Sequence, residues 1–420
     1  MFRFLHAADI HMDSPLRGLE SFEDAPVDQI RGAVRRAFDN LVDLAIREDV
    51  RFVLIGGDLF DGDWKDYNTG IYFNNRMGAL REAGIEVFMV SGNHDAASQI
   101  SRALRLPDNV TLFSHRKAET RILEDLGVAV HGQSFPSRAV LEDLTQGYPQ
   151  GESGLFNIGL LHTALTGRPG HETYAPCTLD GLKSKGYQYW ALGHVHQREE
   201  VSRDPWIVFP GNIQGRHIRE TGPRGCTLVT VDEGRVNAVE PYDIDVLRWA
   251  VGKVDLNGCE NEEACLERVG RTMEDTLAAA DGRPVALRLM LEGVTPLHGS
   301  LHERASHWME EFRGIAAGLM DVWIEKAIFR TVEPSAYQVD SSDISPLSAL
   351  EKEVEGLKKR KENLFEYAPE LEKLRSKLPP ELLDDDNPFD LSDEEMDDLC
   401  EDIRALLTGR ILRQEGRHEN

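Results

Sequence analysis

Cysteine is scarce in this 420-residue sequence, which has five of them scattered between Cys177 and Cys400. Their number is odd and no two are spaced as Cys-x-x-Cys, which argues against a disulfide framework and against a zinc ribbon. We therefore expect a reducing compartment, the cytoplasm. Long hydrophobic runs are also missing, because no apolar stretch approaches the roughly 20 residues that cross a bilayer. The N-terminus shows no cleavage-site pattern, so we expect neither a signal peptide nor a membrane partner.

Positive charge is in short supply as well. The chain has 47 Lys and Arg against 73 Asp and Glu, a net charge of −26. Proteins bind nucleic-acid phosphates largely through Lys and Arg, so a uniformly acidic surface would repel DNA. However, much of the acid lies between Glu381 and Asp402, and bound divalent cations reverse the local sign within a site. Charge alone therefore does not identify the substrate.

What the sequence does contain is a repeated pattern of apolar runs that end in polar residues. The run 51–55 stops at Gly56 and Gly57, which permit a sharp turn, and then delivers Asp58. Four other runs end in the same way, at Asp9 and His11, at Asn93, His94 and Asp95, at His162, and at His194 and His196. Because ligands of open α/β sheets gather beyond the carboxyl ends of strands, we expect these side chains to converge.

The converging side chains offer carboxylate, amide and imidazole donors and no thiolate. Such a mixture suits Mn, Fe or Zn better than Ca or Cu(I). There are enough donors for two ions, and a shared carboxylate is one way to hold two ions about 3.5–4 Å apart. The sequence therefore predicts two divalent metal ions as cofactors, with Mn expected first and Fe or Zn as alternatives.

The complete pattern resembles the calcineurin-like metallophosphoesterases. It consists, in order, of Asp9-x-His11, Gly57-Asp58-x-x-Asp61, Gly92-Asn93-His94-Asp95, His162 and Gly193-His194-x-His196. Two further segments resemble the DNA-repair exonuclease branch of that family, which contains the SbcD and YhaO-like proteins. They are the residues around Thr163 and the segment Phe209-Pro210-Gly211-Asn212-Ile213-Gln214-Gly215-Arg216-His217. The resemblance to the YhaO-like proteins is the nearer of the two. The resemblance covers roughly the first 245 residues.

The resemblance implies a role for each of these residues. Asp9, His11, Asp58 and His196 would hold the first metal, and Asp58, Asn93, His162 and His194 the second. A hydroxide shared by the two metals would attack the phosphodiester, His94 would assist the leaving 3′-oxygen, and Asp95 would orient His94. The substrate-contacting residues would be Arg216, His217 and His171. Asp61 is either a supporting residue or a helix-start residue. His6 and His131 are interpreted as structural, and His298, His302 and His307 as surface residues of a cap.

Three regions follow from the pattern and the resemblance together. Residues 1–245 are expected to form an α/β four-layer metallophosphoesterase sandwich of two packed mixed sheets flanked by helices, with the strands after His196 contributing a second sheet. Residues 246–333 alternate strand and helix as a small α+β cap. Residues 334–420 are expected to be a linker and a C-terminal helical extension, in which Pro369 separates two amphipathic helices and Ser392 starts a last one.

Three functions stay open. The first, implied by the resemblance, is a DNA exonuclease or endonuclease of DNA repair that works with an SMC-like ATPase of the SbcC/YhaN type and forms a homodimer. The second is a small-molecule phosphodiesterase acting on cyclic nucleotides or nucleotides. The third is a scaffold for the ATPase with little activity of its own. The protein phosphatases of the superfamily are disfavoured, because Gly62 follows Asp61 and Asp95 follows His94.

Overall fold

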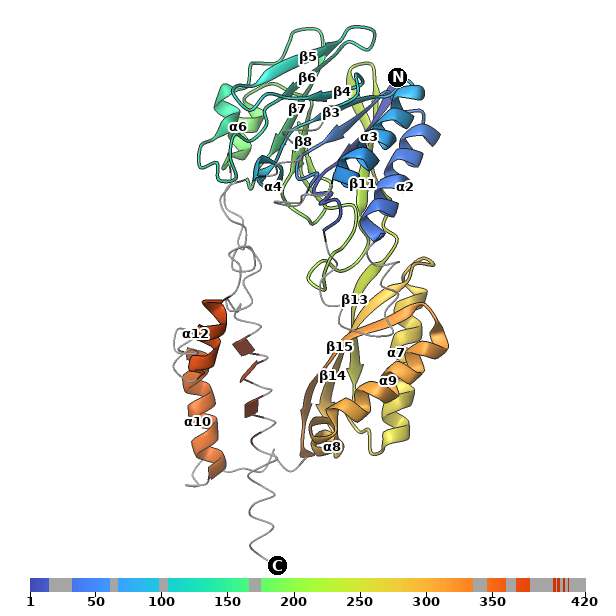
Figure 1. Ribbon diagram of the computed structural model, residues 1–420, viewed down its shortest axis with the longest axis vertical. Coiled ribbons are helices and arrows are strands. Elements are labelled where there is room, and N and C mark those ends of the chain that lie inside the picture. The colour runs from blue at the N-terminus through green and yellow to red at the C-terminus, as the bar shows by residue number, and fades with distance from the viewer. Residues whose placement is uncertain are drawn as a thin grey trace, which may run out of the picture. The chain divides into compact units, whose positions relative to one another are not determined.

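The computed structural model describes residues 1–14, 32–60, 67–97, 105–165, 175–334, 346–359 and 368–377, with a few helical positions between 396 and 407 (Figure 1). Contacts between Cα atoms divide the chain into two compact units. The first consists of residues 1–250 and 277–286, and the second of residues 251–276 and 287–420.

The first sheet of the first unit has six strands in the order β12-β11-β1-β2-β3-β4. These are β12 (Arg235–Asp243), β11 (Gly225–Asp232), β1 (Phe2–Ala7), β2 (Phe52–Ile55), β3 (Glu86–Met89) and β4 (Val110–Leu112). Strands β1 to β4 are parallel, whereas β11 runs antiparallel to β1 and β12 antiparallel to β11. The carboxyl ends of β1, β2 and β3 therefore lie at one edge of this sheet.

The second sheet has the strand order β5-β6-β7-β8-β10-β9. These are β5 (Glu119–Leu123), β6 (Val128–Gly132), β7 (Phe156–His162), β8 (Tyr189–Gly193), β9 (Glu199–Arg203) and β10 (Trp206–Phe209). Strands β6, β7, β8 and β10 are parallel, and β5 and β9 are antiparallel edge strands.

The prediction that the second sheet is made by the strands after His196 was wrong. Only β9 and β10 join it, and they extend a sheet that already begins at β5. Strands β11 and β12 return to the first sheet instead, because β11 pairs with β1 from Phe2↔Val231 to His6↔Thr227. Pairing of this range is set by tertiary packing, which a local pattern does not reveal. Strand β5 was not predicted, since none of its residues is buried.

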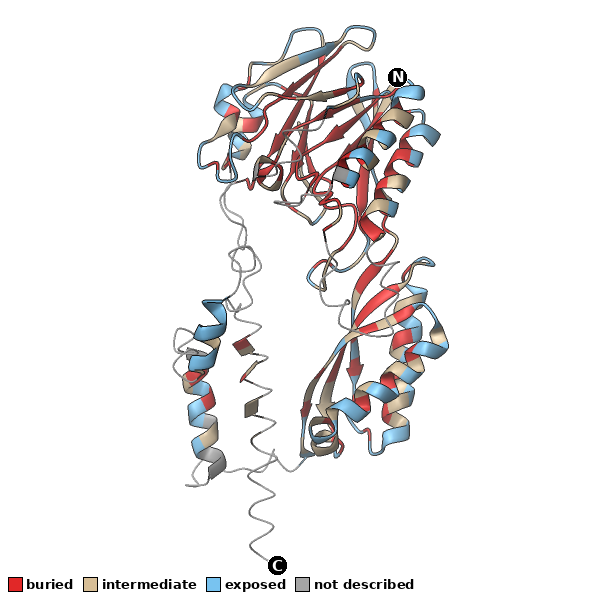
Figure 2. Ribbon diagram, in the orientation of Figure 1, coloured by how far each residue is buried: buried red, intermediate tan, exposed pale blue. Residues whose placement is uncertain are grey.

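The two sheets pack face to face on a shared apolar core, so the predicted four-layer fold is confirmed. Phe4 of the first sheet stacks on Phe52 with ring centroids 4.9 Å apart and meets the edge of Tyr189 from the second sheet at 5.3 Å. Helices α2 (Ala33–Arg47) and α3 (Tyr67–Glu82) and the short α6 (Leu179–Lys183) pack outside the sheets (Figure 1). Figure 2 shows that buried residues run along the strands of both sheets.

The cap elements follow the predicted alternation of strand and helix. They are β13 (Arg248–Asp255), α7 (Glu262–Ala278), β14 (Val285–Val294), α8 (His298–Glu303), α9 (Ala305–Leu319) and β15 (Val322–Val332), with the sheet order β13-β14-β15. Asn261 caps α7, its side-chain oxygen accepting a hydrogen bond of 2.9 Å from the Ala264 amide. The interpretation of His298 and His302 as surface residues was wrong: both are half-buried and their ring centroids lie 4.5 Å apart, whereas His307 is exposed.

In the C-terminal extension the structure describes α10 (Pro346–Lys359) and α12 (Pro369–Arg375). Pro369 begins α12, as expected of a residue that has no amide hydrogen to donate. Val354 and Leu357 of α10 are buried against Met396 and Cys400. The predicted start of the last helix at Ser392 lies outside the described residues. Among the described residues, no helix combines the length and hydropathy that a membrane span requires.

Candidate metal centre

The predicted ligands follow the carboxyl ends of five parallel strands. β1 leads to Asp9 and His11, β2 to Asp58, β3 to Asn93, β7 ends at His162, and β8 leads to His194 and His196. Backbone hydrogen bonds tie the first two of these loops together, from the Asp9 amide to the Gly57 carbonyl at 3.0 Å and from the His11 amide to the Asp58 carbonyl at 2.9 Å. The edge where the two sheets meet therefore gathers all seven residues.

The backbone at this edge is strained in a way that is rare outside functional sites. Four of the seven residues have a positive φ: Asp9 at 50°, His11 at 47°, Asp58 at 52° and His194 at 103°. Side chains other than glycine occupy this region at a cost of roughly 1–3 kcal/mol each, and such residues cluster at sites where the geometry is functional. The strain turns these side chains toward one another instead of along the strands.

Two glycines leave the space that the donors occupy. Gly57 has a φ of 99°, and a Cβ on it would lie 2.6 Å from Nδ1 of His162. A Cβ on Gly92 would lie 2.8 Å from Nε2 of His162 and closer still to Oδ1 of Asp58. Both positions therefore require glycine for the close approach that the sequence predicted at Asp58.

The first group of donors contains Asp9, His11 and His196, whose ligand atoms all lie within 4.8 Å of one another. The Nε2 atoms of His11 and His196 are 3.3 Å apart. Both carboxylate oxygens of Asp9 accept a hydrogen bond from the backbone amide of His194, each at 3.0 Å. Two imidazole nitrogens and a carboxylate directed at one point are donors that Zn, Mn or Fe accepts.

The second group is built around Asp58 and His162. Nε2 of His162 lies 3.3 Å from Oδ2 of Asp58 and 3.0 Å from Oδ1 of Asn93. Asp9, Asp58 and His162 offer ligand atoms within 4.8 Å of one another. The ring of His194 meets the edge of the His162 ring at 5.2 Å. Asp9 is common to the two groups, and Asp58 also lies within 4.8 Å of a ring nitrogen of His11 from the first group.

The charges of this edge also fit divalent cations. Asp9 and Asp58 are almost fully buried, and among the described residues neither forms an ion pair with Lys or Arg. Burial raises the pKa of Asp9; for Asp58, burial is outweighed by the attraction of His162 and His94, which holds its pKa well below the usual range. Burial would lower the pKa of His162, but the charge of Asp58 outweighs it and raises that pKa to about 9. A buried pair of carboxylates that has no Lys or Arg partner is stabilised by metal cations, which replace the protons on the imidazoles.

His94 lies at the same centre and is half-buried. Its ring meets that of His11 edge-on, with centroids 4.8 Å apart, and its backbone amide donates to Oδ1 of Asp58 at 3.0 Å. One of its ring nitrogens, a nitrogen of His11 and an oxygen of Asp58 lie within 4.8 Å of one another. The sequence assigned His94 to the leaving group and not to a metal, and the structure places it within reach of the donors.

Asp95 differs from the prediction. Its carboxylate accepts hydrogen bonds from the backbone amides of Leu59, Phe60 and Gly92 at 3.1, 2.9 and 3.2 Å. These bonds use both oxygens and join the loop after β2 to the loop after β3. Asp95 therefore holds the backbone that follows Asp58 and the backbone at Gly92 instead of orienting the His94 ring. A His-Asp pair in the sequence does not reveal this role.

Glu220 is a residue that sequence reasoning missed. Its Oε1 lies 2.6 Å from Nδ1 of His196, and its Oε2 accepts from the Asn212 amide group at 2.9 Å and from the Arg216 backbone at 2.7 Å. Burial would raise the pKa of Glu220, but the charge of Arg216 and the bond to His196 outweigh it and hold that pKa well below its usual range. A carboxylate on the far nitrogen of a metal-binding histidine fixes the ring orientation. No local pattern marks this glutamate among the charged residues around it.

The predicted substrate-contacting residues are only partly placed. Arg216 lies beside the centre, with Nη1 3.3 Å from Oγ of Ser14 and Nη2 3.6 Å from Glu220. Nε2 of His217 lies 3.7 Å from the same carboxylate. His171 and Asp61 lie outside the described residues.

The structural interpretation of two further histidines is confirmed. Nδ1 of His6 lies 3.1 Å from the Tyr189 hydroxyl, and its Nε2 lies 3.1 Å from the Leu192 carbonyl. The two ring nitrogens of His131 contact Thr120 and Asn157. Both rings are thus fully used in packing the sheets.

Comparison with known proteins matches two family models to this chain. Residues 2–198 match the model for calcineurin-like phosphoesterases, and residues 249–332 match the model for the middle domain of the metallophosphoesterase YhaO. Among solved structures, a dimetal phosphatase from Danio rerio aligns with a TM-score of 0.33 and 15% identity, over 55% of this chain and 93% of that chain.

Two curated relatives cover most of the same region. The DNA double-strand break repair protein Mre11 of Methanopyrus kandleri is 26% identical over 66% of this chain and 65% of that protein. The metallophosphoesterase YhaO of Bacillus subtilis, described as uncharacterized, is 36% identical over 299 residues, which is 70% of this chain and 72% of that protein. At that identity and coverage, the chain belongs to the YhaO-type calcineurin-like metallophosphoesterases.

Proposed function

We propose that this metal-dependent phosphoester hydrolase is a DNA nuclease of DNA repair. The observation that carries the proposal is the convergence of two buried carboxylates, an asparagine and four histidines on one edge, where among the described residues no Lys or Arg pairs with either carboxylate. This donor set suits two divalent cations and a phosphodiester between them. The curated relatives named as Mre11 support DNA as the substrate.

Each residue of the centre has a separate role in the proposed hydrolysis. Bound at these donors, two divalent cations supply Lewis acidity and a water acidic enough to attack phosphorus near neutral pH. Asp58, between the two donor groups, fixes their spacing. His94, which reaches the centre from the short helix α4 (Asn93–Ala97), donates a proton or a hydrogen bond to the leaving 3′-oxygen. Glu220 and Asp95 hold the ligands and loops in place.

The proposal extends to the metal, the partners and the compartment. We take Mn as the native metal, the cytoplasm as the compartment and a homodimer as the assembly. An SMC-like ATPase of the SbcC/YhaN type would bind the C-terminal extension. This last point rests on the resemblance to the SbcD and YhaO-like proteins.

The test is hydrolysis by the purified chain with Mn on linear, hairpin and single-stranded DNA, with a bis-phosphodiester chromogen in parallel. Cleavage of DNA that is lost in His94→Ala, while two metal ions are still bound, supports the nuclease. The alternative is a small-molecule phosphodiesterase. Hydrolysis of the chromogen and of nucleotides without cleavage of any DNA, with the ATPase added, would favour that alternative.

A further inference from the structure

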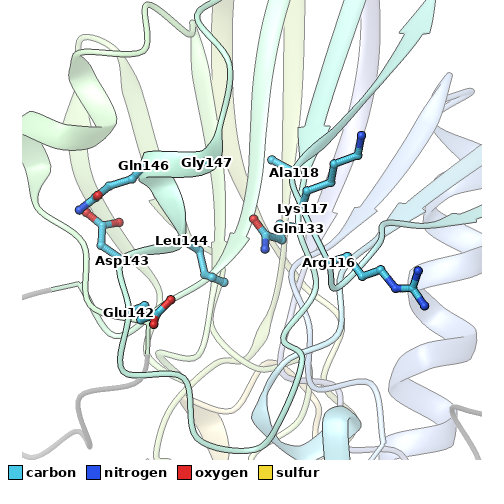
Figure 3. A pocket seen from close by; sticks show the side chains of 9 residues that line it. All are labelled: Arg116, Lys117, Ala118, Gln133, Glu142, Asp143, Leu144, Gln146 and Gly147. Carbon is cyan, nitrogen blue, oxygen red and sulfur yellow. The ribbon is translucent and has the colours of Figure 1, made fainter.

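A pocket of about 550 Å³ opens in the first unit. Arg116 and Lys117 stand on one wall, and Glu142 and Asp143 on the other (Figure 3). In Figure 3, Gln133 lies between the two walls, with Leu144 extending toward it. The pocket therefore combines cations, carboxylates, an amide and an apolar side chain.

The floor of this pocket is connected to the metal centre through two residues. Gln133 directly follows β6 at the carboxyl edge of the second sheet. Next to it, Oγ of Ser134 accepts from the Ser91 amide at 3.0 Å, and Ser91 immediately precedes the Gly92-Asn93 motif. The ring of Phe135 meets the edge of the His162 ring, with centroids 5.3 Å apart. The segment that begins at Gln133 on the floor of the pocket therefore continues into residues that contact the loop and the histidine of the candidate metal centre.

Four of the polar side chains that line the pocket have no partner within the described residues, whereas Asp143 accepts hydrogen bonds from Thr145. Gln133 is only 7% exposed, yet its side-chain amide makes no hydrogen bond within the part of the chain that the structure describes. Over the same residues, the side chains of Arg116, Lys117 and Glu142 form no ion pair. The amide of Gln133 is not among the enclosed polar atoms that lack a partner, so it faces the open pocket, where a ligand can replace its water. The lining is thus prepared for a polar ligand.

We propose that the pocket takes one unpaired nucleotide of the DNA strand next to the scissile phosphate. The backbone phosphate lies along Arg116 and Lys117, and the base enters toward Gln133. The amide of Gln133 and the carboxylate of Glu142 face the donors and acceptors of the base edge, and Leu144 packs on its face. This inference rests on the proposed function. It also deepens it, because a base whose edge is read by Gln133 is free of its complement.

The first experiment compares two double charge reversals of equal net charge. Arg116→Glu/Lys117→Glu alters the pocket. Arg81→Glu/Arg235→Glu is the matched control, because both residues lie toward the amino ends of the parallel strands. Arg81 is in the last turn of α3, shortly before β3 begins, and Arg235 is the first residue of β12, where it pairs with Asp232. Anisotropy of a fluorescent single-stranded oligonucleotide is measured in chelator over a salt series, and thermal melting checks that both variants fold.

We expect the pocket variant to bind the oligonucleotide at least about tenfold more weakly at low salt. The slope of log affinity against log salt should fall by about 0.7, the value for one phosphate of a single strand that is no longer neutralised. The control should stay within about twofold of wild type. An unchanged affinity and slope in the pocket variant would overturn the inference, even if the wild-type protein binds and cuts DNA.

The second experiment tests the base. Gln133→Leu keeps the size of the side chain and removes its amide, so binding of single-stranded DNA should weaken severalfold with an unchanged salt slope. An oligonucleotide of abasic sites should bind wild type and Gln133→Leu equally, and a difference there would contradict base recognition. Deoxyadenosine monophosphate distinguishes a strand from a free nucleotide. If wild type binds that mononucleotide and no DNA, the strand assignment and the nuclease proposal both fail; if it cuts DNA but Gln133→Leu binds normally, only the pocket inference fails.

Discussion

Oε1 of Glu220 lies 2.6 Å from Nδ1 of His196, while Nε2 of the same ring lies 3.3 Å from Nε2 of His11. The imidazole is therefore held on one side by a buried carboxylate and faces the donor group on the other. This arrangement fixes the His196 ring and leaves Nε2 available to a metal, because the carboxylate accepts the proton of Nδ1.

Glu220→Gln should weaken metal binding at the first donor group by about 10- to 100-fold, the range typical of lost outer contacts to metal-binding histidines. The amide can still contact His196 but no longer fixes the tautomer. Calorimetric titration of the metal-free protein should show one site weakened and the other retained. Glu200→Gln is the matched control, because Glu200 pairs with Arg198 at 3.1 Å and contacts no predicted ligand. Equal loss in both variants would reduce Glu220 to a structural role.

Gly92→Ala should abolish tight metal binding. The new Cβ would lie 2.8 Å from Nε2 of His162 and nearer still to Asp58, so one of the two donors must move. Gly78→Ala in α3 is the control, because a Cβ there has no neighbour within 4 Å, and alanine in a helix is worth up to about 1 kcal/mol more than glycine. Mn titration followed by enzyme assay compares the two, and full metal affinity in Gly92→Ala would contradict the geometry described here.

Mn should raise the melting temperature of the wild-type chain. Binding to the folded state alone adds about 2.7 kcal/mol at a concentration 100 times the dissociation constant, which corresponds to a shift of about 5–10 °C for a unit of this size. Asp9→Asn should remove most of the shift, since Asp9 supplies a donor to two of the candidate groups. The measurement is differential scanning fluorimetry with and without Mn, and an equal shift in the variant would rule out Asp9 as a ligand.

The stability of the metal-free protein should fall as the pH falls below about 6.5. Burial, with a further contribution from Arg198, lowers the pKa of His6 to about 3. Between pH 6.5 and pH 3, His6 is therefore protonated in the unfolded chain and neutral in the folded chain. The unfolded state is thereby favoured, by up to about 1.4 kcal/mol per pH unit for one proton. His6→Gln should flatten this dependence in urea unfolding between pH 6 and 4. The exposed His307→Gln is the control, and an unchanged slope in His6→Gln would contradict the assignment.

The sequence was sufficient to predict the residues of the centre and the elements that carry them. Each of Asp9, Asp58, Asn93, His162 and His194 follows an apolar run, and the local run identifies the strand. The sharp turn before Asp58 was expected from Gly56 and Gly57, and Gly57 has a positive φ. These inferences succeeded because each depends on the few residues around it.

Other properties depend on contacts between distant parts of the chain. β11 joins the first sheet because Val231 pairs with Phe2, more than two hundred residues away in sequence. Asp95 accepts hydrogen bonds from the backbone amides of Leu59 and Phe60 instead of contacting the His94 ring, because the loops after β2 and β3 are brought together only in the folded sheet.

The sequence by itself determined that oxygen and imidazole donors follow successive strands, because strand periodicity and donor chemistry are local properties. Only the tertiary structure decided which strands share a sheet, that Glu220 supports His196, and that Gln133 lines a pocket with Arg116 and Lys117. Those depend on the register and packing of segments far apart in the chain, where the free energy of burial, and not local preference, selects the neighbours.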